Sequence, residues 1–247
     1  MTSPLDDYNR KRNFDRTAEP PGTAAPRDDG AAGGRNGRLR FAVQHHLASR
    51  DHYDLRLEWN GTLLSWAVPK GPSYNPRDKR LAVRVEDHPL DYRTFEGTIP
   101  QGEYGGGTVM LWDEGWWEPL VDVEQGLREG DLKFALHGHR LKGAWVLVHM
   151  KPKKGERDVN WLLIKEKDDY VRADAGIDGF ETSVQTGRTM DEIARGEDEA
   201  FAANPFDHVD VELAKLVSTA PPGDDWLFEV KYDGYRIVAY VEGGRAR

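Results

Sequence analysis

The chain has 247 residues and a formal net charge of −9, and its length is enough for one or two domains with a proper core. It contains no cysteine, which excludes disulfides, thiolate metal sites and a cysteine nucleophile. No apolar run is long enough to span a membrane and the N-terminus lacks a signal-peptide core, so we expect a soluble, cytoplasmic protein without a membrane partner.

Residues 1–37 are expected to form a disordered N-terminal arm. The stretch "AEPPGTAAPRDDGAAGGRNG", residues 18–37, holds Pro, Gly, Ala and charged residues with almost no large apolar side chain, which is typical of a flexible tether. The preceding stretch "YNRKRNFDRT", residues 8–17, is basic and aromatic. Its composition suits docking on another surface.

Residues 38–168 carry the signals of an antiparallel β-domain. Short runs rich in β-branched and aromatic residues alternate with turn signals, and no long amphipathic helix interrupts them. This pattern is typical of a β-barrel or a curled sandwich. The dipeptide Asn60-Gly61 between two alternating runs is the clearest hairpin signal. We expect strands within residues 39–46, 52–59, 62–69, 79–86, 107–113, 131–138, 141–150 and 159–167.

The region 169–210 is interpreted as an acidic linker. Residues 166–212 hold 4 Lys and Arg against 14 Asp and Glu, whereas residues 35–110 hold 11 against 9. The overall acidity therefore argues little against an anionic substrate at the β-domain. One short helix is predicted at Thr189–Arg195, with Thr189 as its N-cap and two acidic residues in its first turn.

Residues 211–247 alternate again, in "DWLFEVKYDGYRIVAYVEGG". This amounts to about one hairpin, which is too little for a domain. We interpret the segment as the truncated start of a further domain.

The stretch "HYDLRLE", residues 52–58, alternates two kinds of side chain. Because a strand sends successive side chains to opposite faces, His52, Asp54 and Arg56 share a face that the intervening apolar residues do not. If the strand that ends near His46 folds back at a bend over residues 48–50, His46, His52 and Asp54 converge.

Two imidazoles and one carboxylate leave coordination positions open for water and substrate, which is typical of a catalytic site for Mn²⁺ or Zn²⁺. Arg56, one step along the same face, would direct a guanidinium at an anion on the metal. The alternative is a polar outer face whose charges are merely solvated.

Two further stretches carry anion-binding side chains. "VPKGPSYNPRDKR" places Lys70 and Arg80 around a Pro/Gly loop, which is either a solvated hairpin tip or a phosphate-binding rim. "VEDHPLDY" supplies His88 and Tyr92. They are either core or turn residues, or His88 is a second functional histidine and Tyr92 lies beside it. "EYGGGTVMLW" lacks the Gly-Lys-Ser/Thr of a phosphate loop, so we predict a turn or bulge there.

Together these motifs resemble the 3′-phosphoesterase domain of bacterial ATP-dependent DNA ligase D, the ligase of non-homologous end joining. The resemblance runs from Phe41 to about Lys165, and "YNRKRNFDRTAEP" near the N-terminus also matches. "FEVKYDGYR", residues 228–236, is similar to the first nucleotidyltransferase motif of ATP-dependent DNA ligases. The other matching pieces are "QHHLASRDHYDLRLE", "SWAVPKGPS", "KRLAVRVEDHPLDY", "FEGTIPQGEYGGGTV" and "WLLIKEKD".

The resemblance implies a β-barrel with a Mn²⁺-dependent activity that trims 3′ DNA ends. A 3′-terminal ribonucleoside is removed, then the 3′-phosphate, which leaves a 3′-hydroxyl. The implied partners are DNA 3′ ends, at primer-templates or double-strand breaks, and a Ku-type end-binding protein. The implied metal ligands are His46, His52 and Asp54; the catalytic contacts to the scissile phosphate are Arg56 and His88; and the substrate-binding residues are Arg12, Gln44, Lys70, Arg80 and Tyr92.

Two roles stay open for His88. An imidazole can hold its proton near neutral pH, so His88 suits a general acid to the leaving 3′ oxygen. Simple phosphate binding is equally compatible with its place in the motif. The chain also departs from the family pattern: the N-terminal motif often reads Lys-Arg-Asp-Phe, whereas Asn13 stands here in place of the aspartate.

Lys231 would be the lysine that takes AMP from ATP in a complete ligase domain. We expect that activity only from a longer chain, because the later ligase motifs are absent from this sequence. The remaining interpretation is a non-catalytic DNA-end-binding module, which would need no metal.

Overall fold

The computed structural model describes residues 3–23, 37–152, 155 and 159–196, and the backbone of residues 241–242 and 245–246. The chain divides into two units, residues 1–200 and residues 201–247. In the second unit, β11 (Val241–Glu242) pairs antiparallel with β12 (Arg245–Ala246). The ligase-like motif with Lys231 lies outside the described residues.

The first unit consists mainly of strands, as predicted. All eight predicted strand regions contain a strand. In chain order its elements are α1 (Asp6–Arg10), β1 (Leu39–Leu47), β2 (Asp51–Trp59), β3 (Thr62–Val68), β4 (Arg80–Arg84), β5 (His88–Pro89), the 3₁₀ helix η1 (Leu90–Thr94), β6 (Gly97–Ile99), β7 (Gly107–Pro119), α2 (Val123–Glu129), β8 (Asp131–Gly138), β9 (Lys142–His149), β10 (Asn160–Lys165) and α3 (Met190–Ala194).

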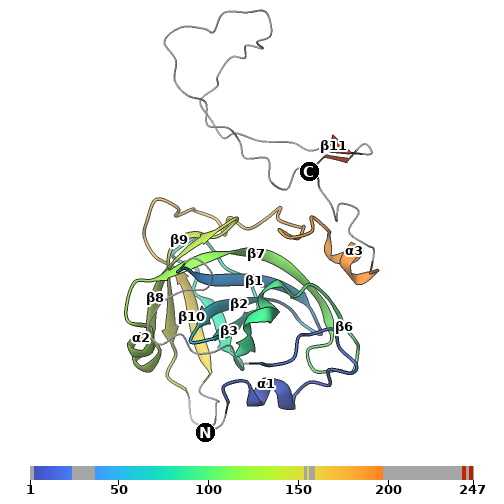
Figure 1. The fold of residues 1–247 in the computed structure, drawn as a ribbon. Helices are drawn as coiled ribbons and strands as arrows, with labels where there is room; N and C mark the ends of the chain where they lie inside the picture. The colour runs from blue at the N-terminus through green and yellow to red at the C-terminus, as the bar shows by residue number, and fades with distance from the viewer. Residues whose placement is uncertain are drawn as a thin grey trace, which may run out of the picture. The chain divides into compact units, whose positions relative to one another are not determined.

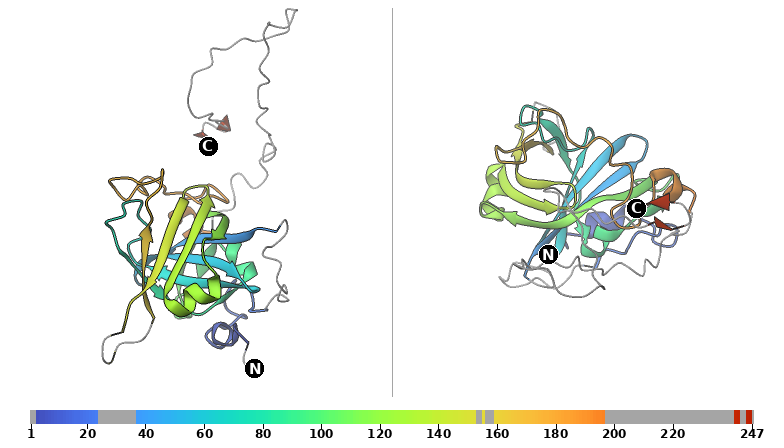
Figure 2. Two further views of the ribbon diagram at one scale, coloured as in Figure 1. Left: turned by 90° about the vertical axis from the view of Figure 1, so that its left-hand side faces the viewer. Right: turned by 90° about the horizontal axis from the view of Figure 1, so that it is seen from above.

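The strands close into an eight-stranded antiparallel barrel, which confirms the predicted fold class. Neighbours follow the order β1-β2-β3-β4-β10-β9-β8-β7, and β7 pairs back onto β1. Figure 1 shows the long β7 running beside β1, and Figure 2 shows the curved strands from two further sides. The short strands β5 and β6 extend this sheet by pairing with β3 and β7.

The β2–β3 hairpin turns at Asn60-Gly61, as predicted. Both residues have positive φ, 48° and 80°, which is the requirement of a tight two-residue turn. The turn sets the register Trp59↔Thr62 and so fixes which side chains face the interior.

Alternation along β1 and β2 separates an apolar face from a polar one. Phe41, Val43, Leu55 and Leu57 belong to the main core cluster, and each is at most 2% exposed. Their neighbours in the sequence point to the opposite face of the sheet. Burial of the apolar face in the core therefore fixes the direction of the side chains on the polar face of this hairpin.

Residues 3–23 pack on the barrel, in contrast to the expected disordered arm. Leu5 and Tyr8 are both 0% exposed and form a second apolar cluster with Leu63, Tyr92 and other side chains outside the main core. The Tyr8 hydroxyl donates to the carbonyl of Pro20 at 2.6 Å, which folds the segment back on itself. Leu5 and Tyr8 thus dock the segment, together with ion pairs from Lys11 and Arg12 to Glu86. Residues 24–36 lie outside the described part of the chain.

Residues 168–196 also contact the barrel, where the sequence indicated a linker. Ile193 on α3 is 2% exposed within the main core cluster, and Trp112 Nε1 donates to the carbonyl of Phe180 at 3.0 Å. The predicted helix is confirmed: Thr189 caps it in a capping box with Glu192. Helix α2, capped by Asp122, was not predicted.

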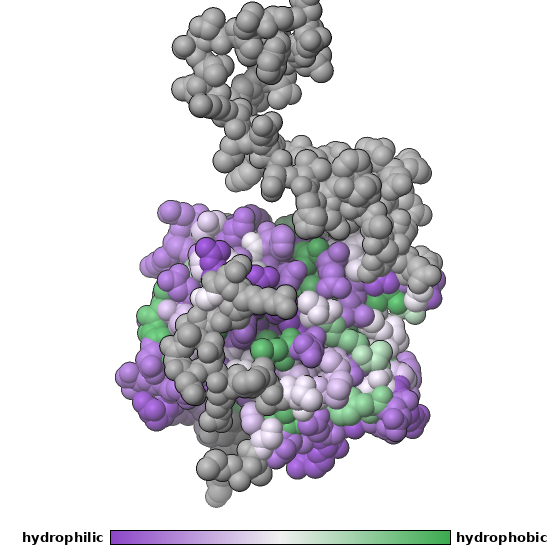
Figure 3. Space-filling model, in the orientation of Figure 1, coloured by the Kyte–Doolittle hydropathy of each residue, from purple (hydrophilic) through white to green (hydrophobic). Residues whose placement is uncertain are grey.

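The surface seen in Figure 3 is mostly hydrophilic, with apolar residues in small separate groups. Within the described residues, no helix combines the length and apolar character needed to cross a membrane.

Candidate functional site

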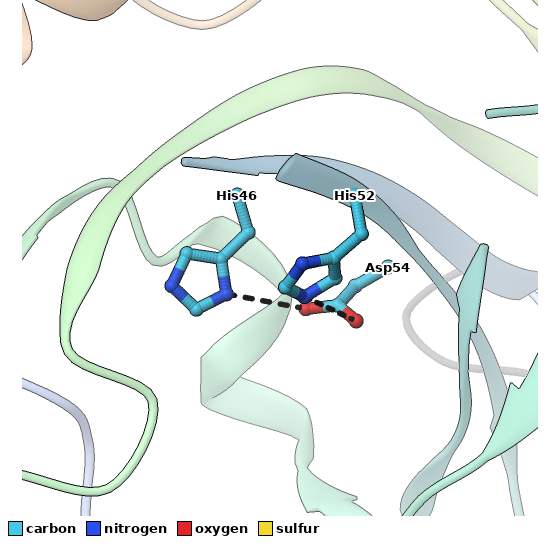
Figure 4. A group of neighbouring side chains, drawn as sticks. All are labelled: His46, His52 and Asp54. Atoms are coloured by element: carbon cyan, nitrogen blue, oxygen red, sulfur yellow. Dashed lines mark ion pairs between the residues drawn. The ribbon is translucent and has the colours of Figure 1, made fainter. Parts of the chain in front are cut away.

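The β1–β2 hairpin brings His46, His52 and Asp54 together, as the sequence predicted. His46 pairs directly with His52, and Gln44 pairs with Asp54, so these side chains share one face. Figure 4 shows the two imidazoles and the carboxylate turned toward one another from neighbouring strands. His46 Nδ1 lies 3.9 Å and His52 Nε2 lies 3.6 Å from the nearest carboxylate oxygen of Asp54.

These separations fit a shared cation better than direct hydrogen bonds. Two ligands each about 2.1 Å from a tetrahedral ion lie roughly 3.4 Å apart. The candidate ligand atoms of His46, His52 and Asp54 all lie within 4.8 Å of one another. Asp54 and His46 are buried and His52 is half-buried, so the group is open on one side only.

The protonation of both histidines suits metal binding. His52 Nδ1 lies 2.8 Å from the carbonyl of Arg50, which can only accept, so Nδ1 carries the proton and Nε2 offers its lone pair toward Asp54. Burial lowers the pKa of His46, although the charge of Asp54 acts in the opposite direction. A neutral imidazole is the form that ligates a metal.

Arg56 lies beside this group and is 2% exposed. Its NH2 group donates to Asp54 Oδ2 at 3.0 Å, its Nε to Gln44 Oε1 at 2.5 Å and its NH1 to Ser65 Oγ at 3.0 Å. The guanidinium also stacks against Tyr92, with Cζ 4.6 Å from the ring centroid. These contacts fix the plane of the guanidinium, which orients its remaining N–H donors for the oxygens of an anion.

His88 is 3% exposed and reaches the same place from β5. Its Nδ1 lies 2.9 Å from the carbonyl of Glu86, and its Nε2 lies 3.2 Å from the NH2 group of Arg12. Because an arginine only donates, Nε2 is the acceptor and His88 is neutral. Burial, followed by the positive charges of Arg56 and Arg12, holds the pKa of His88 well below 6.5.

Two carboxylates that the sequence reading missed hold Arg12 in place. Arg12 Nε lies 2.8 Å from Glu19 Oε1, and Arg12 NH1 lies 3.1 Å from Glu86 Oε1. Burial alone would raise the pKa of Glu86, but the hydrogen bond from Lys11 and the charge of Arg12 lower it. Glu86 stands two residues before His88, a spacing that could have indicated it, whereas Glu19 sits in a Pro-rich stretch without such a signal.

These side chains surround one cavity of about 240 Å³. It combines the three candidate metal ligands with two buried arginines and with residues of the N-terminal segment. Its lining is Arg12, Glu19, His46, Ala48, Ser49, His52, Asp54, Arg56, Ala67, Val85, Glu86, His88, Tyr92, Ile99, Tyr104 and Gly105.

Three other predicted residues lie elsewhere. Gln44 is 0% exposed behind Arg56, with its amide nitrogen donating to the carbonyls of Tyr92 and Phe95, so it supports the site and does not line it. Lys70 and Arg80 line a separate cavity of about 400 Å³, where Arg80 pairs with Asp78 at 3.1 Å.

Asn13, which departs from the family pattern, is also outside the cavity lining. Its side-chain oxygen accepts a hydrogen bond from the backbone N–H of Asp15 at 3.2 Å. It therefore stabilises a local turn of the N-terminal segment.

The comparisons with known proteins agree with this geometry. The family defined as the DNA ligase D 3′-phosphoesterase domain matches residues 44–149, which include the hairpin with His46, His52 and Asp54 and also His88.

Three curated relatives match over nearly the whole chain. The multifunctional non-homologous end joining protein LigD of Pseudomonas aeruginosa is 45% identical over 267 residues, which cover 100% of this chain and 30% of the relative. The LigD DNA repair protein of Mycobacterium tuberculosis is 35% identical, and the match covers 97% of this chain and 26% of the relative. LigD of Mycolicibacterium smegmatis is 33% identical, and the match covers 98% of this chain and 27% of the relative. The chain thus spans less than a third of these relatives.

The matched residues form a closed antiparallel barrel that carries the histidine, aspartate and arginine cluster on one hairpin. Both the family match and the relatives point to the same domain. Residues 44–149 of this chain therefore belong to the DNA ligase D 3′-phosphoesterase domain family.

Proposed function

We propose that this protein is a metal-dependent phosphoesterase that trims the 3′ ends of DNA during the repair of double-strand breaks. It removes a 3′-terminal ribonucleoside and then the 3′-phosphate, and it leaves a 3′-hydroxyl. The observation that carries the proposal is the convergence of His46, His52 and Asp54 beside the buried Arg56, in a family whose name describes this activity.

His46 Nδ1, His52 Nε2 and the Asp54 carboxylate would hold the metal, for which we propose Mn²⁺, with Zn²⁺ as the alternative for a mixed nitrogen and oxygen set. A divalent ion bound there supplies a Lewis acid that polarises a phosphoryl oxygen. Arg56 donates to the scissile phosphate and neutralises the charge that builds on it in the transition state. Asp54 contacts both the metal position and Arg56, so it sets their spacing.

His88 acts in this proposal by orienting Arg12 toward the phosphate, because its Nε2 accepts from the NH2 group of Arg12. As a general acid it would need a proton on Nε2, but that nitrogen accepts from Arg12, and burial with two arginines lowers the pKa of His88. A phosphate oxygen that enters the cavity can take the donors of Arg12, while Nδ1 stays bonded to the carbonyl of Glu86. His88 thus holds Arg12 in place, and Arg12 donates to the phosphate.

The variant His88→Ala tests whether His88 belongs with the residues that act on the phosphate or with the metal ligands. We expect it to lose phosphate removal and to keep a Mn²⁺ affinity near that of the wild type, since His88 is outside the ligand cluster. Turnover of a 3′-phosphate primer-template and calorimetric titration with Mn²⁺ measure the two effects. Loss of Mn²⁺ binding would move His88 into the coordination shell.

The test of the whole proposal is a primer-template that ends in a 3′-phosphate, incubated with Mn²⁺ or with EDTA. We expect a 3′-hydroxyl product only with metal, and no product from His46→Ala, His52→Ala or Asp54→Ala, because each removes one of three protein ligands. Circular dichroism of each variant controls for folding. Binding of DNA ends without turnover, equal with and without metal, would support a non-catalytic end-binding module instead.

The partners we propose follow from this activity. DNA 3′ ends are the substrate, and a Ku-type end-binding protein would present them. ATP enters only through a complete ligase domain that uses Lys231. The relatives are named as multifunctional end-joining proteins, and their further activities are not assigned to this chain.

A further inference from the structure

Tyr104 stands out among the side chains that line the catalytic cavity. It is 47% exposed, whereas Tyr92 and His88 in the same cavity are 2% and 3% exposed. Large aromatic side chains left at the mouth of a charged cavity commonly provide a stacking surface for a ligand. No contact within the site proposed above requires Tyr104.

The backbone around Tyr104 forms a hydrogen-bonded turn that fixes where the side chain starts. A turn links the Glu103 N–H to the carbonyl of Pro100 at 3.2 Å and the Gly106 N–H to the carbonyl of Glu103 at 3.0 Å. Gly105 follows with φ of 77°, a conformation that side-chain-bearing residues rarely adopt, and it lies next to the His46 ring. The turn thus ties the position of Tyr104 to the candidate metal centre.

Two cations from the N-terminal segment hold the ring itself. Lys11 Nζ lies 4.8 Å from the ring centroid and 3.3 Å from the hydroxyl, and Arg12 Cζ lies 5.4 Å from the centroid. Both side chains are anchored on Glu86, at 2.9 Å and 3.1 Å. An exposed ring that is oriented in this way loses little entropy when a second flat group packs on it.

We propose that Tyr104 binds the nucleobase of the 3′-terminal nucleoside that is cut off. The inference rests on the proposed function and deepens it. The scissile phosphate occupies the buried part of the cavity between Arg56 and His88, so the nucleoside beyond it extends to the rim. Stacking on Tyr104 is independent of base identity because every base has a π-face. Tyr104 therefore favours ends that carry a nucleoside, and it contributes nothing to a bare 3′-phosphate.

The test compares two primer-templates that differ only at the 3′-terminal residue: one ends in a ribonucleoside, the other in the same ribose without a base. For the wild type we expect kcat/KM to be about tenfold higher with the base, within the range of base–aromatic stacking. In Tyr104→Ala this ratio falls to near one, mainly through KM. Tyr104→Phe and Tyr104→Trp keep the ratio, because both retain an aromatic face for stacking and lack the hydroxyl bonded to Lys11.

Tyr170→Ala is the matched control, since Tyr170 is 48% exposed and does not line the cavity; it should keep the wild-type ratio. A wild-type ratio near one, or an unchanged ratio in Tyr104→Ala, overturns the inference. A loss in Tyr104→Phe as large as in Tyr104→Ala also overturns it, and assigns Tyr104 to clamping Lys11.

Failure of the proposed phosphoesterase function gives a different result from failure of the stacking inference. In that case the wild type releases nothing from either primer and does not remove a 3′-phosphate with Mn²⁺. Fluorescence anisotropy with the same two primers in EDTA then still tests the stacking. Tighter binding of the base-bearing primer that depends on Tyr104 supports it, and equal binding overturns it.

Discussion

Arg56 obtains its orientation from three neighbours, one on its own strand β2 and one on each of the adjacent strands β1 and β3. Gln44, Asp54 and Ser65 each accept one of its N–H groups, and the register Arg56↔Ser65 and Gln44↔Asp54 places all three acceptors around one guanidinium. A lysine offers a point charge and cannot reproduce three fixed donor directions. The geometry of this single side chain is therefore a sensitive test of the site.

Arg56→Lys should lower kcat/KM for 3′-phosphate removal by about 10² or more, the usual loss when an oriented donor to a transition state is removed. Gln44→Met should have a smaller effect of the same kind, since it removes only one of the three acceptors. Mn²⁺ affinity, measured by calorimetry, should stay near the wild-type value in both. Full activity of Arg56→Lys would contradict the role given to the guanidinium.

At the residue scale, the sequence predicts the hairpin cluster because its pattern is local. His52, Asp54 and Arg56 share a face by strand alternation, and a short bend brings His46 opposite His52. The sequence pattern does not predict the partners of Arg12. Glu19 meets Arg12 through the fold of a Pro-rich segment, a contact that depends on tertiary packing and leaves no periodic signal.

At the scale of elements, predictions from composition were wrong for segments that a few apolar residues pack on the barrel. The segment before the barrel contains little apolar surface, yet Leu5 and Tyr8 bury fully against the outer face of β3 and η1. The loop with Lys70 follows β3, Arg80 is the first residue of β4, and both residues line a cavity of their own. Pattern reasoning assigns residues to strands and loops, but it does not give the distance between two loops.

The strand β7 carries a buried carboxylate with a structural role. Asp113, which is 0% exposed next to a register shift in the β1–β7 pairing, accepts hydrogen bonds from the N–H groups of Arg140 at 2.9 Å and Leu141 at 2.8 Å. It thus holds the turn between β8 and β9. Burial raises the pKa of Asp113 to about 6, although both hydrogen bonds act to lower it.

This pKa predicts a pH dependence of stability. Asp113 loses its proton near 3.8 in the unfolded chain but only near 6 in the folded barrel, so its contribution declines as pH rises from about 4 to 6 and is constant above that. The decline is about 3 kcal/mol in the free energy of unfolding. Asp113→Asn should lack it, which urea unfolding at pH 4 and at pH 7 measures. Equal pH profiles for both proteins would show that folding does not raise the pKa of Asp113.

At the scale of the whole molecule, every residue of the cavity lies between Arg12 and Gly105. The elements that complete the barrel and cover it end at α3. Residues 197–240 lie outside the described part of the chain.

A chain that ends at Gly196 should therefore keep its 3′-end trimming, with kcat/KM and thermal unfolding unchanged from the 247-residue chain. Lys231→Ala in the longer chain is the matched control and should also leave trimming unchanged. Loss of activity in a chain that ends at Gly196 and still unfolds cooperatively would mean that residues after α3 contribute to catalysis.

The most direct measurement is the anomalous diffraction of crystals soaked in Mn²⁺, which locates the ion without reference to activity. We predict one strong peak, about 2 Å from His46 Nδ1, His52 Nε2 and the Asp54 carboxylate. The peak should be absent from crystals of Asp54→Ala. A peak elsewhere, for example at the His45–Asp51 pair, with none between His46 and His52, would contradict the account of the site.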